Sequence, residues 1–158
     1  MERYSKKVVR IFVDADSCPV KSEIVEVAKD YVADVTFIAS YAHVSETDLG
    51  AKWIFVDSAK EAVDLHIMNK VCANDVVVTQ DHGLASILLP KGVVVISPRG
   101  KIYHENNMDL MLQLRYISAK ERRAGHHSKG PKAFSSNDRN YFIKSFKKIL
   151  SKLAGIKS

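Results

Sequence analysis

Five short runs of apolar, β-forming residues alternate with segments of helical periodicity, and this alternation is the strongest constraint on the fold. The runs are VVRIFVD, DVTFIAS, AKWIFVD, VVVTQD and VVVIS, at 8–14, 34–40, 51–57, 76–81 and 93–97. Runs of this length and character are typical of strands that are buried on both faces. The pattern predicts an α/β fold, a three-layer α/β/α sandwich around a mostly parallel sheet.

Helices are expected between and after these strands. The periodic segments begin near Pro19 and continue at 59–72, 84–89, 105–124 and 135–152, with a loop at 125–134. Ser17 or Cys18 is the expected cap of the first helix. Ser135, followed three residues later by Asp138, predicts a capping box for the last one. A chain of 158 residues fits one domain with a substantial core.

Carboxylates follow the predicted strands at their carboxyl ends. Asp14, Asp57 and Asp81 each end a strand, Asp16 lies just beyond the first, and Glu61 and Asp64 lie in the first turns of the helix after the third. In a parallel sheet these ends meet at one edge, so the like charges would raise one another's pKa. A hard divalent cation relieves this repulsion, and the set predicts a Mg²⁺ or Mn²⁺ site. For any single aspartate, helix capping is an equally good explanation.

Several other classes of site have no support in the sequence. A P-loop, a GxGxxG motif and a zinc pattern of Cys and His are absent. No apolar stretch is long enough to span a bilayer or to form the core of a signal peptide, so we expect a cytoplasmic protein. Cys18 and Cys72 are expected to be free thiols, and Cys18 is expected to be packed rather than nucleophilic.

Charge is distributed unevenly along the chain. Residues 1–119 contain 13 Lys and Arg against 16 Asp and Glu, whereas residues 120–158 contain 11 against 2. Within the basic part, the lysines of the last helix are interpreted as its solvated face. The segment KERRAGHHSKGPK at 120–132 is interpreted as a phosphate-binding loop, whose basic residues would bind a nucleic acid backbone: Arg122, Arg123, Lys129 and Lys132. An ordinary exposed loop is the alternative.

Several motifs resemble a known group of proteins. AVDLHIMNKVCANDVVVTQDHGLA at 62–85 resembles the central signature of PIN-domain ribonucleases, with Asp64 opening a helix and Thr79-Gln80-Asp81 after a strand. Asp14 matches the first metal ligand of that family, and either Glu61 or Asp57 matches its middle acid. More closely, VDADSCPVK, VVVTQDHGLA, SPRG and GPKAFSSNDRNYF are similar to motifs of the bacterial YaiI/YqxD family, which is PIN-like.

The resemblance implies a single PIN-like domain over 1–158, with a basic, helical C-terminal segment from about residue 120. It implies metal-assisted hydrolysis of RNA phosphodiesters, the RNA being single-stranded or structured. Asp14, Asp64 and Asp81 would be the catalytic ligands of Mg²⁺ or Mn²⁺, completed through water by Glu61 or Asp16. The match at Gly130-Pro131 and Asp138-Arg139 supports RNA binding by the basic segment and adds Arg139.

Two other functions remain open from the residues alone. An apolar strand followed by Asp14 and Asp16 is also how phosphatases of the haloacid dehalogenase type begin, with the first Asp as nucleophile and the second as acid and base. Thr79 could then belong to their second motif, but their later acidic motif is not evident after VVVIS. The third possibility is a non-catalytic RNA-binding protein, which would retain the basic segment and need no metal.

Overall fold

A computed structural model of the chain describes residues 8–41, 49–59, 61–105, 120 and 133–154. These residues form a five-stranded sheet of order β3-β2-β1-β4-β5. Its strands are β1 (Val9–Asp14), β2 (Ala33–Ser40), β3 (Lys52–Val56), β4 (Val76–Val78) and β5 (Val94–Ile96). Every neighbouring pair in this order is parallel, which confirms the predicted parallel sheet.

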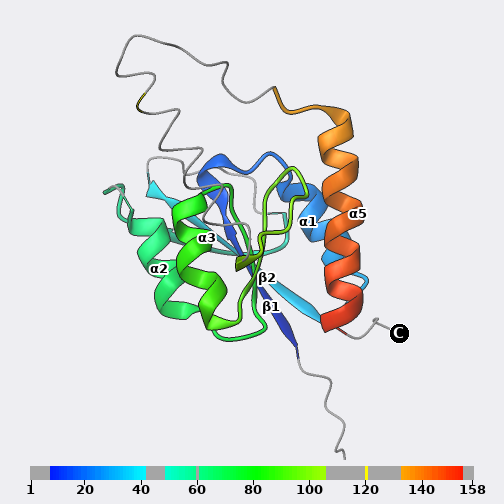
Figure 1. Ribbon diagram of the computed structural model, residues 1–158, viewed down its shortest axis with the longest axis horizontal. Coiled ribbons are helices and arrows are strands. Elements are labelled where there is room, and N and C mark those ends of the chain that lie inside the picture. Colours follow the sequence, from blue (N-terminus) through cyan, green and yellow to red (C-terminus); the bar gives the residue numbers. More distant parts are fainter. Residues whose placement is uncertain (1–7, 42–48, 60, 106–119, 121–132, 155–158) are drawn as a thin grey trace, which may run out of the picture.

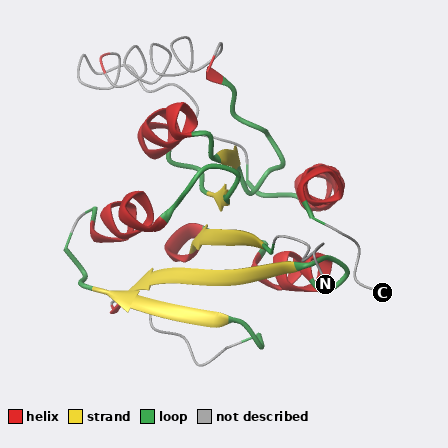
Figure 2. Cartoon of the chain, turned by 90° about the horizontal axis from the view of Figure 1, so that it is seen from below, coloured by secondary structure: helices red, strands yellow, loops and turns green. Residues whose placement is uncertain are grey.

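Helices cover both faces of the sheet. Figure 1 shows α2 (Ala62–Lys70) and α3 (His82–Leu88) on one side, and α1 (Lys21–Ala28) and α5 (Ser136–Leu153) on the other. Figure 2, turned by 90°, also shows helices on both sides of the strands. The predicted three-layer α/β/α architecture is therefore confirmed.

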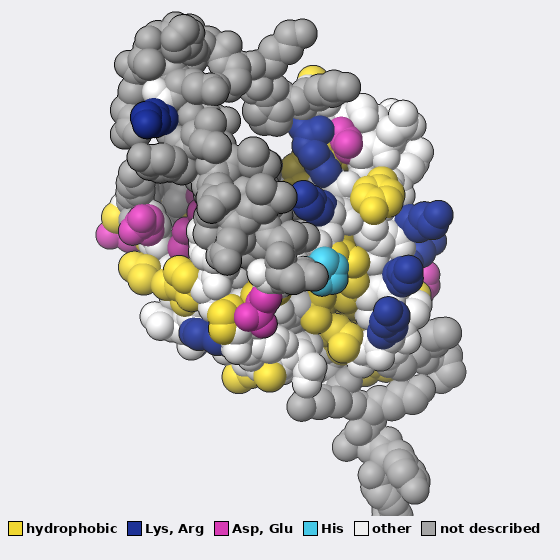
Figure 3. Space-filling model, in the orientation of Figure 1, with side chains coloured by type: hydrophobic (Ala, Val, Ile, Leu, Met, Phe, Trp, Pro, Cys, Tyr) yellow, Lys and Arg dark blue, Asp and Glu magenta, His cyan; other side chains and the backbone are white. Residues whose placement is uncertain are grey.

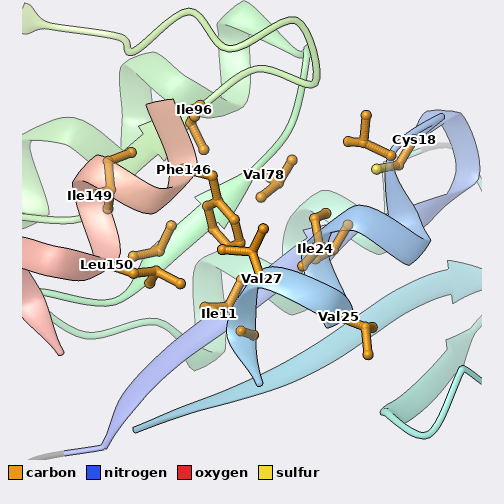
Figure 4. Packing of buried hydrophobic residues seen from close by; sticks show 14 of the residues in the cluster. Ile11, Cys18, Ile24, Val25, Val27, Val78, Ile96, Phe146, Ile149 and Leu150 are labelled. Carbon is orange, nitrogen blue, oxygen red and sulfur yellow. The ribbon is translucent and has the colours of Figure 1, made fainter. Parts of the chain in front are cut away.

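The alternation of side chains along β1 separates the core into two parts. Ile11 and Val13 belong to the cluster shared with α1 and α5, whereas Phe12 faces the cluster shared with α2 and α3. Successive strand residues point to opposite faces, so a strand apolar at nearly every position holds both layers together. In Figure 4, Phe146 of α5 lies beside Val27 of α1 within the first cluster.

The last helix has a defined start and a solvated face. Ser135 Oγ accepts from the Asp138 N–H and the Asp138 carboxylate accepts from the Ser135 N–H, which confirms the predicted capping box. The four lysines that follow are exposed, as expected of a solvated face: Lys144, Lys147, Lys148 and Lys152. Figure 3 shows Lys and Arg side chains gathered on the side of the molecule where α5 lies in Figure 1.

Several predicted boundaries are wrong by one to three residues, and two of them lie close to the ends of β4 and β1. The strand predicted over 76–81 ends at Val78, although the Thr79 N–H still donates to the Ile96 carbonyl of β5 at 3.0 Å. The first α-helix begins at Lys21, and its N-cap is Val20 rather than Ser17 or Cys18. Residues after β1 form a separate 3-10 turn, η1 (Ala15–Ser17), so the α-helix starts later than the capping pattern indicated.

Two predicted elements lie mostly outside the described residues. They are the helix at 105–124 and the loop at 125–134. Among the described helices, none has the length and apolar character needed to cross a bilayer. Cys18 and Cys72 are both free thiols, the first buried and the second exposed, as predicted.

The strand order creates a switch point between β1 and β4. The chain builds β2 and β3 on one side of β1 and then returns to build β4 and β5 on the other side. Connections that leave in opposite directions open a crevice at the carboxyl ends of the two central strands, and ligands of open α/β sheets bind there. Asp14 is the last residue of β1 and therefore lies at this crevice.

Candidate functional site

Thr79 connects the ends of the two central strands. Its hydroxyl donates to Asp14 Oδ2 at 3.0 Å, and its Oγ1 accepts from the Asp81 N–H at 3.1 Å. Thr79 is 1% exposed, so these two bonds satisfy a polar group that is out of contact with water. The Asp14 carboxylate is thereby held in a fixed position relative to the segment that contains Asp81.

Asp81 is held by the helix that follows it. It is the N-cap of α3, and its Oδ1 accepts from the Leu84 N–H at 3.1 Å, so the capping role considered for this residue is real. A Cβ atom at Gly83 would lie 3.2 Å from the same Oδ1. The absence of a side chain at position 83 therefore leaves room for the carboxylate.

Helix α2 brings two further carboxylates to Asp81. Glu61 is the N-cap residue of α2, in the left-handed region with φ 71°, and Asp64 follows in the first turn. Together with Asp81 they line a cavity of about 230 Å³ between α2 and α3. The other lining residues are Leu65, Met68, Gly83, Leu84 and Ile87. The cavity lining therefore combines three carboxylates with four apolar side chains.

The pKa values show that these carboxylates interact. Burial raises the pKa of Asp64 to about 7, and the charge and side-chain hydrogen bond of Asp81, followed by the charges of Asp14 and Glu61, contribute to the increase. Burial also raises the pKa of Asp14, against the hydrogen bond from Thr79, and the charges of Asp16 and Asp81 add to the effect. We call this set the acidic cluster: Asp14, Asp16, Glu61, Asp64 and Asp81.

Asp16 and Asp57 differ in their relation to the cluster. Asp16 Oδ1 accepts from the Ser40 N–H at 3.0 Å, which ties η1 to the end of β2. Asp57 follows β3 and is exposed, and the acid from this part of the chain that raises the pKa of Asp64 is Glu61. Of the two candidates for the middle acid, the structure therefore brings Glu61 into the cluster.

The donor atoms of the acidic cluster suit a hard cation, because all of them are carboxylate oxygens. Within the described ranges, however, no group of three or more His, Cys, Asp or Glu side chains is arranged to hold a metal ion as it stands. Asp64 and Asp81 instead interact through a hydrogen bond, which relieves their repulsion. The chemistry of the donors fits Mg²⁺ or Mn²⁺, and binding would replace the shared proton.

Two other ionisable groups have structural roles. Asp75, at the opposite end of the sheet, forms an ion pair with Arg10 at 2.6 Å and accepts from the Cys72 N–H at 2.7 Å. Burial raises the pKa of Cys18 to about 11, so its thiol stays protonated and nonreactive at neutral pH. Neither group belongs to the acidic cluster.

Of the predicted RNA-binding residues, only Arg139 lies within the described residues. It donates to Glu23 at 2.5 Å and to the Pro19 carbonyl at 3.1 Å, and its guanidinium lies 5.2 Å from the centre of the Phe134 ring. These contacts join α5 to α1. Arg122, Arg123, Lys129 and Lys132 lie outside the described residues, and RNA binding by this set remains a prediction.

Sequence reasoning missed one residue of this site. The sequence assigns Thr79 to a Thr-x-Asp motif or to the second motif of a phosphatase, whereas the structure shows that it orients Asp14 and anchors the Asp81 backbone. A threonine immediately after three buried valines was the available signal, because a hydroxyl at such a position must find a partner.

Comparisons with known proteins identify relatives over nearly the whole chain. A family model described as "Uncharacterized BCR, YaiI/YqxD family" matches residues 12–152. A UPF0178 protein of Listeria monocytogenes is 55% identical over 85% of this chain and 91% of its own length. UPF0178 proteins of Halalkalibacterium halodurans and Bacillus cytotoxicus are 51% and 49% identical over 96% of this chain and 97% and 99% of their own lengths. No solved structure matches significantly.

Proposed function

Because this chain belongs to the YaiI/YqxD family and brings carboxylates from several elements to the switch point of its sheet, we propose that it is a metal-dependent ribonuclease. The observation that carries the proposal is the linkage of Asp14 through Thr79 to Asp81, beside a cavity that Asp64 and Glu61 also line. This is the location where open α/β sheets bind ligands.

Asp14, Asp64 and Asp81 would hold Mg²⁺ or Mn²⁺, with Glu61 and Asp16 completing the site through water. When bound, the cation would lower the pKa of water and stabilise negative charge on the phosphate. Thr79 keeps the Asp14 carboxylate oriented, and α3 fixes that of Asp81. Asp64, whose pKa is raised to about 7, would hold the cation in its deprotonated form.

The basic segment would supply the contacts to the RNA backbone. Arginine side chains grip phosphate through two parallel hydrogen bonds, and contacts of this kind bind the backbone without reading its sequence. The proposed contacts are Arg122, Arg123, Lys129, Lys132 and Arg139. The acidic cluster and the basic segment would thus divide catalysis and binding between them.

Thermal unfolding tests the metal site. A ligand that binds only the folded state at 100 times its Kd adds about 2.7 kcal/mol, which is a rise in Tm of about 5–10 °C for a chain of this size. We expect Mn²⁺ to give such a rise with the wild-type protein and none with the Asp14→Asn, Asp81→Asn double variant. Asp34→Asn, a matched change at an exposed position in β2, should retain the rise. An unchanged metal response in the double variant would refute the site.

Activity assays separate the nuclease from the phosphatase. We expect Mn²⁺-dependent cleavage of single-stranded RNA, little hydrolysis of phosphomonoesters and no trapping by beryllofluoride. Asp14→Asn should lose cleavage, whereas Asp16→Asn should retain measurable cleavage, because Asp16 is engaged with the Ser40 backbone. Robust phosphomonoesterase activity with a beryllofluoride adduct on Asp14 would replace the nuclease by a phosphatase. RNA binding without either activity would instead indicate a non-catalytic RNA-binding protein.

A further inference from the structure

Four aromatic side chains form a continuous stack along the edge of the sheet. Ring centres lie 4.6 Å apart for Phe37 and Trp53, 5.8 Å for Trp53 and Phe55, and 6.2 Å for Phe55 and Tyr41. The planes of these pairs are inclined by 28°, 14° and 25°, so each pair is stacked. We call this set the aromatic ladder.

The aromatic ladder is buried at one end and exposed at the other. Phe37 is 0% exposed and pairs in register with Trp53 on β3, which is an edge strand of the sheet. Trp53 and Phe55 are partly buried against the core, whereas Tyr41 is 63% exposed. Packing of the core accounts for the inner rings, but it does not account for an exposed tyrosine stacked in line with them.

The exposed end of the ladder lies beside the acidic cluster. Tyr41 directly follows β2, and the preceding residue, Ser40, donates its N–H to Asp16. Asp14 pairs with Ile38 on β2, three residues before Tyr41, so Tyr41 lies at the same carboxyl edge of the sheet as Asp14. The ladder packs with the core on the α1 side of the sheet, whereas the acidic cavity lies between α2 and α3 on the other side. A strand of nucleic acid that crossed the carboxyl edge of the sheet would therefore place a phosphate at the acidic cluster and a base on Tyr41.

We infer that the aromatic ladder is a stacking platform for the unpaired bases of a single-stranded RNA, with Tyr41 as the ring that the base contacts. The inference rests on the proposed function for the identity of the ligand. Every nucleobase has a face that stacks on an aromatic ring, whereas a base in a duplex has both faces covered by its neighbours. The platform therefore selects single strands over duplexes, without preference for sequence.

A second copy of the chain is the other possible occupant of this edge. It would add a strand to β3 through backbone hydrogen bonds, an interaction that does not need an aromatic ring at position 41. The in-line stacking of Tyr41 and its position next to the carboxylates favour RNA. Dimer formation is an outcome that the experiment below can detect.

Binding is measured in EDTA, so that it does not depend on cleavage. The probe is a single-stranded oligoribonucleotide that contains 2-aminopurine, whose fluorescence is quenched on stacking, with the duplex form as comparison. Stacking on a protein ring contributes about 1–3 kcal/mol per base, so Tyr41→Ala should weaken affinity about 5- to 150-fold and abolish quenching. Tyr41→Phe should retain both. Tyr141→Ala removes an equally exposed tyrosine, 57% against 63%, outside the ladder and should bind like the wild type.

The outcomes separate this inference from the proposed function. Wild-type quenching that Tyr41→Ala abolishes supports the platform, even if no variant cleaves RNA with Mn²⁺, in which case only the nuclease fails. Metal-dependent cleavage with unchanged affinity and quenching in Tyr41→Ala overturns the platform and leaves the nuclease. Absence of RNA binding in EDTA overturns the platform, and absence of Mn²⁺-dependent cleavage as well overturns both. A dimer in sedimentation, with RNA affinity and quenching unchanged in Tyr41→Ala, assigns the edge to a second copy.

Discussion

Asp64 shows how a single side chain can be unfavourable for folding and still useful. Its pKa is raised to about 7, first by burial and then by neighbouring carboxylates, from an ordinary value of 3.8. Between these two values the folded state holds a proton that the unfolded state has lost, so the stability of the metal-free protein falls as the pH rises. The residue therefore weakens the empty protein under the conditions in which its charge would bind a cation.

We expect Asp64→Asn to be more stable than the metal-free wild type at pH 8 and to have no such advantage at pH 4. Because Asp64 is only partly buried, screening by solvent limits the gain to roughly 1 kcal/mol, or about 2–4 °C in Tm. Calorimetry in EDTA across this range measures the difference. Asp34→Asn, which removes an exposed carboxylate outside the acidic cluster, is the matched control. A constant difference for Asp64→Asn at both pH values would contradict the assignment.

At the scale of elements, the attachment of α5 depends on one glycine. Gly100 has φ 92°, and a Cβ atom there would lie 2.7 Å from the Tyr141 ring and 2.9 Å from the Phe142 backbone. The turn after β5 therefore approaches the helix backbone more closely than any other residue would permit. The same region is joined by the ion pair of Arg99 with Asp138 at 2.7 Å.

Gly100→Ala should destabilise the protein by about 2–4 kcal/mol, because it combines an unfavourable backbone conformation with overpacking. Urea denaturation followed by circular dichroism measures the change. Gly50→Ala is the matched control, since Gly50 has φ 72° and nothing lies within 4 Å of its Cβ position. It should show only the backbone effect, about 1 kcal/mol. Equal losses in the two variants would show that contact with α5 is unimportant.

The elements themselves could be predicted from local pattern, but their ends and cross-connections could not. The apolar character of Ile11, Phe12 and Val13 predicted a strand buried on both faces, and the strand-end aspartates predicted that carboxylates would meet. The bond from Thr79 to Asp14 joins residues 65 positions apart, and no local periodicity encodes it. The end of β4 was also misplaced, since pairing with β1 and β5 ends at Val78 and the residue pattern of 76–81 does not mark that point.

At the scale of the whole molecule, the acidic cluster and the basic segment at 120–132 have opposite charge. We therefore expect the basic segment, and not the acidic cluster, to provide the electrostatic part of RNA binding. Replacing Arg122, Arg123 and Lys129 by Ala should weaken binding about equally for all sequences. It should also reduce the slope of log K against log salt by about 2, since each lost contact to a single strand removes about 0.7. Metal affinity should not change. Titrations at several salt concentrations measure both quantities.

The control for this experiment is Lys144, Lys147 and Lys148 replaced by Ala, which removes the same charge from the exposed face of α5. It should leave most of the slope intact, because these lysines are interpreted as a solvated surface. If both triple variants lose equal affinity, net charge governs binding and residues 120–132 have no special role.

The position of α5 at the end of the sequence has a consequence for folding during translation. Its contacts with residues that flank α1 include Arg139 to the Pro19 carbonyl and Tyr31 to Ser151, each spanning 120 residues. Ribosomes add about 5–20 residues per second. Synthesis of the residues between α1 and α5 therefore takes roughly 10 s, and α5 cannot cover the apolar side of α1 and β1 before it is complete. During that interval the nascent chain exposes Ile11 and Ile24, which are 0% exposed once folding is complete. Translation speed, and the chaperones that meet chains at the exit tunnel, should therefore affect how much of this protein reaches its folded state.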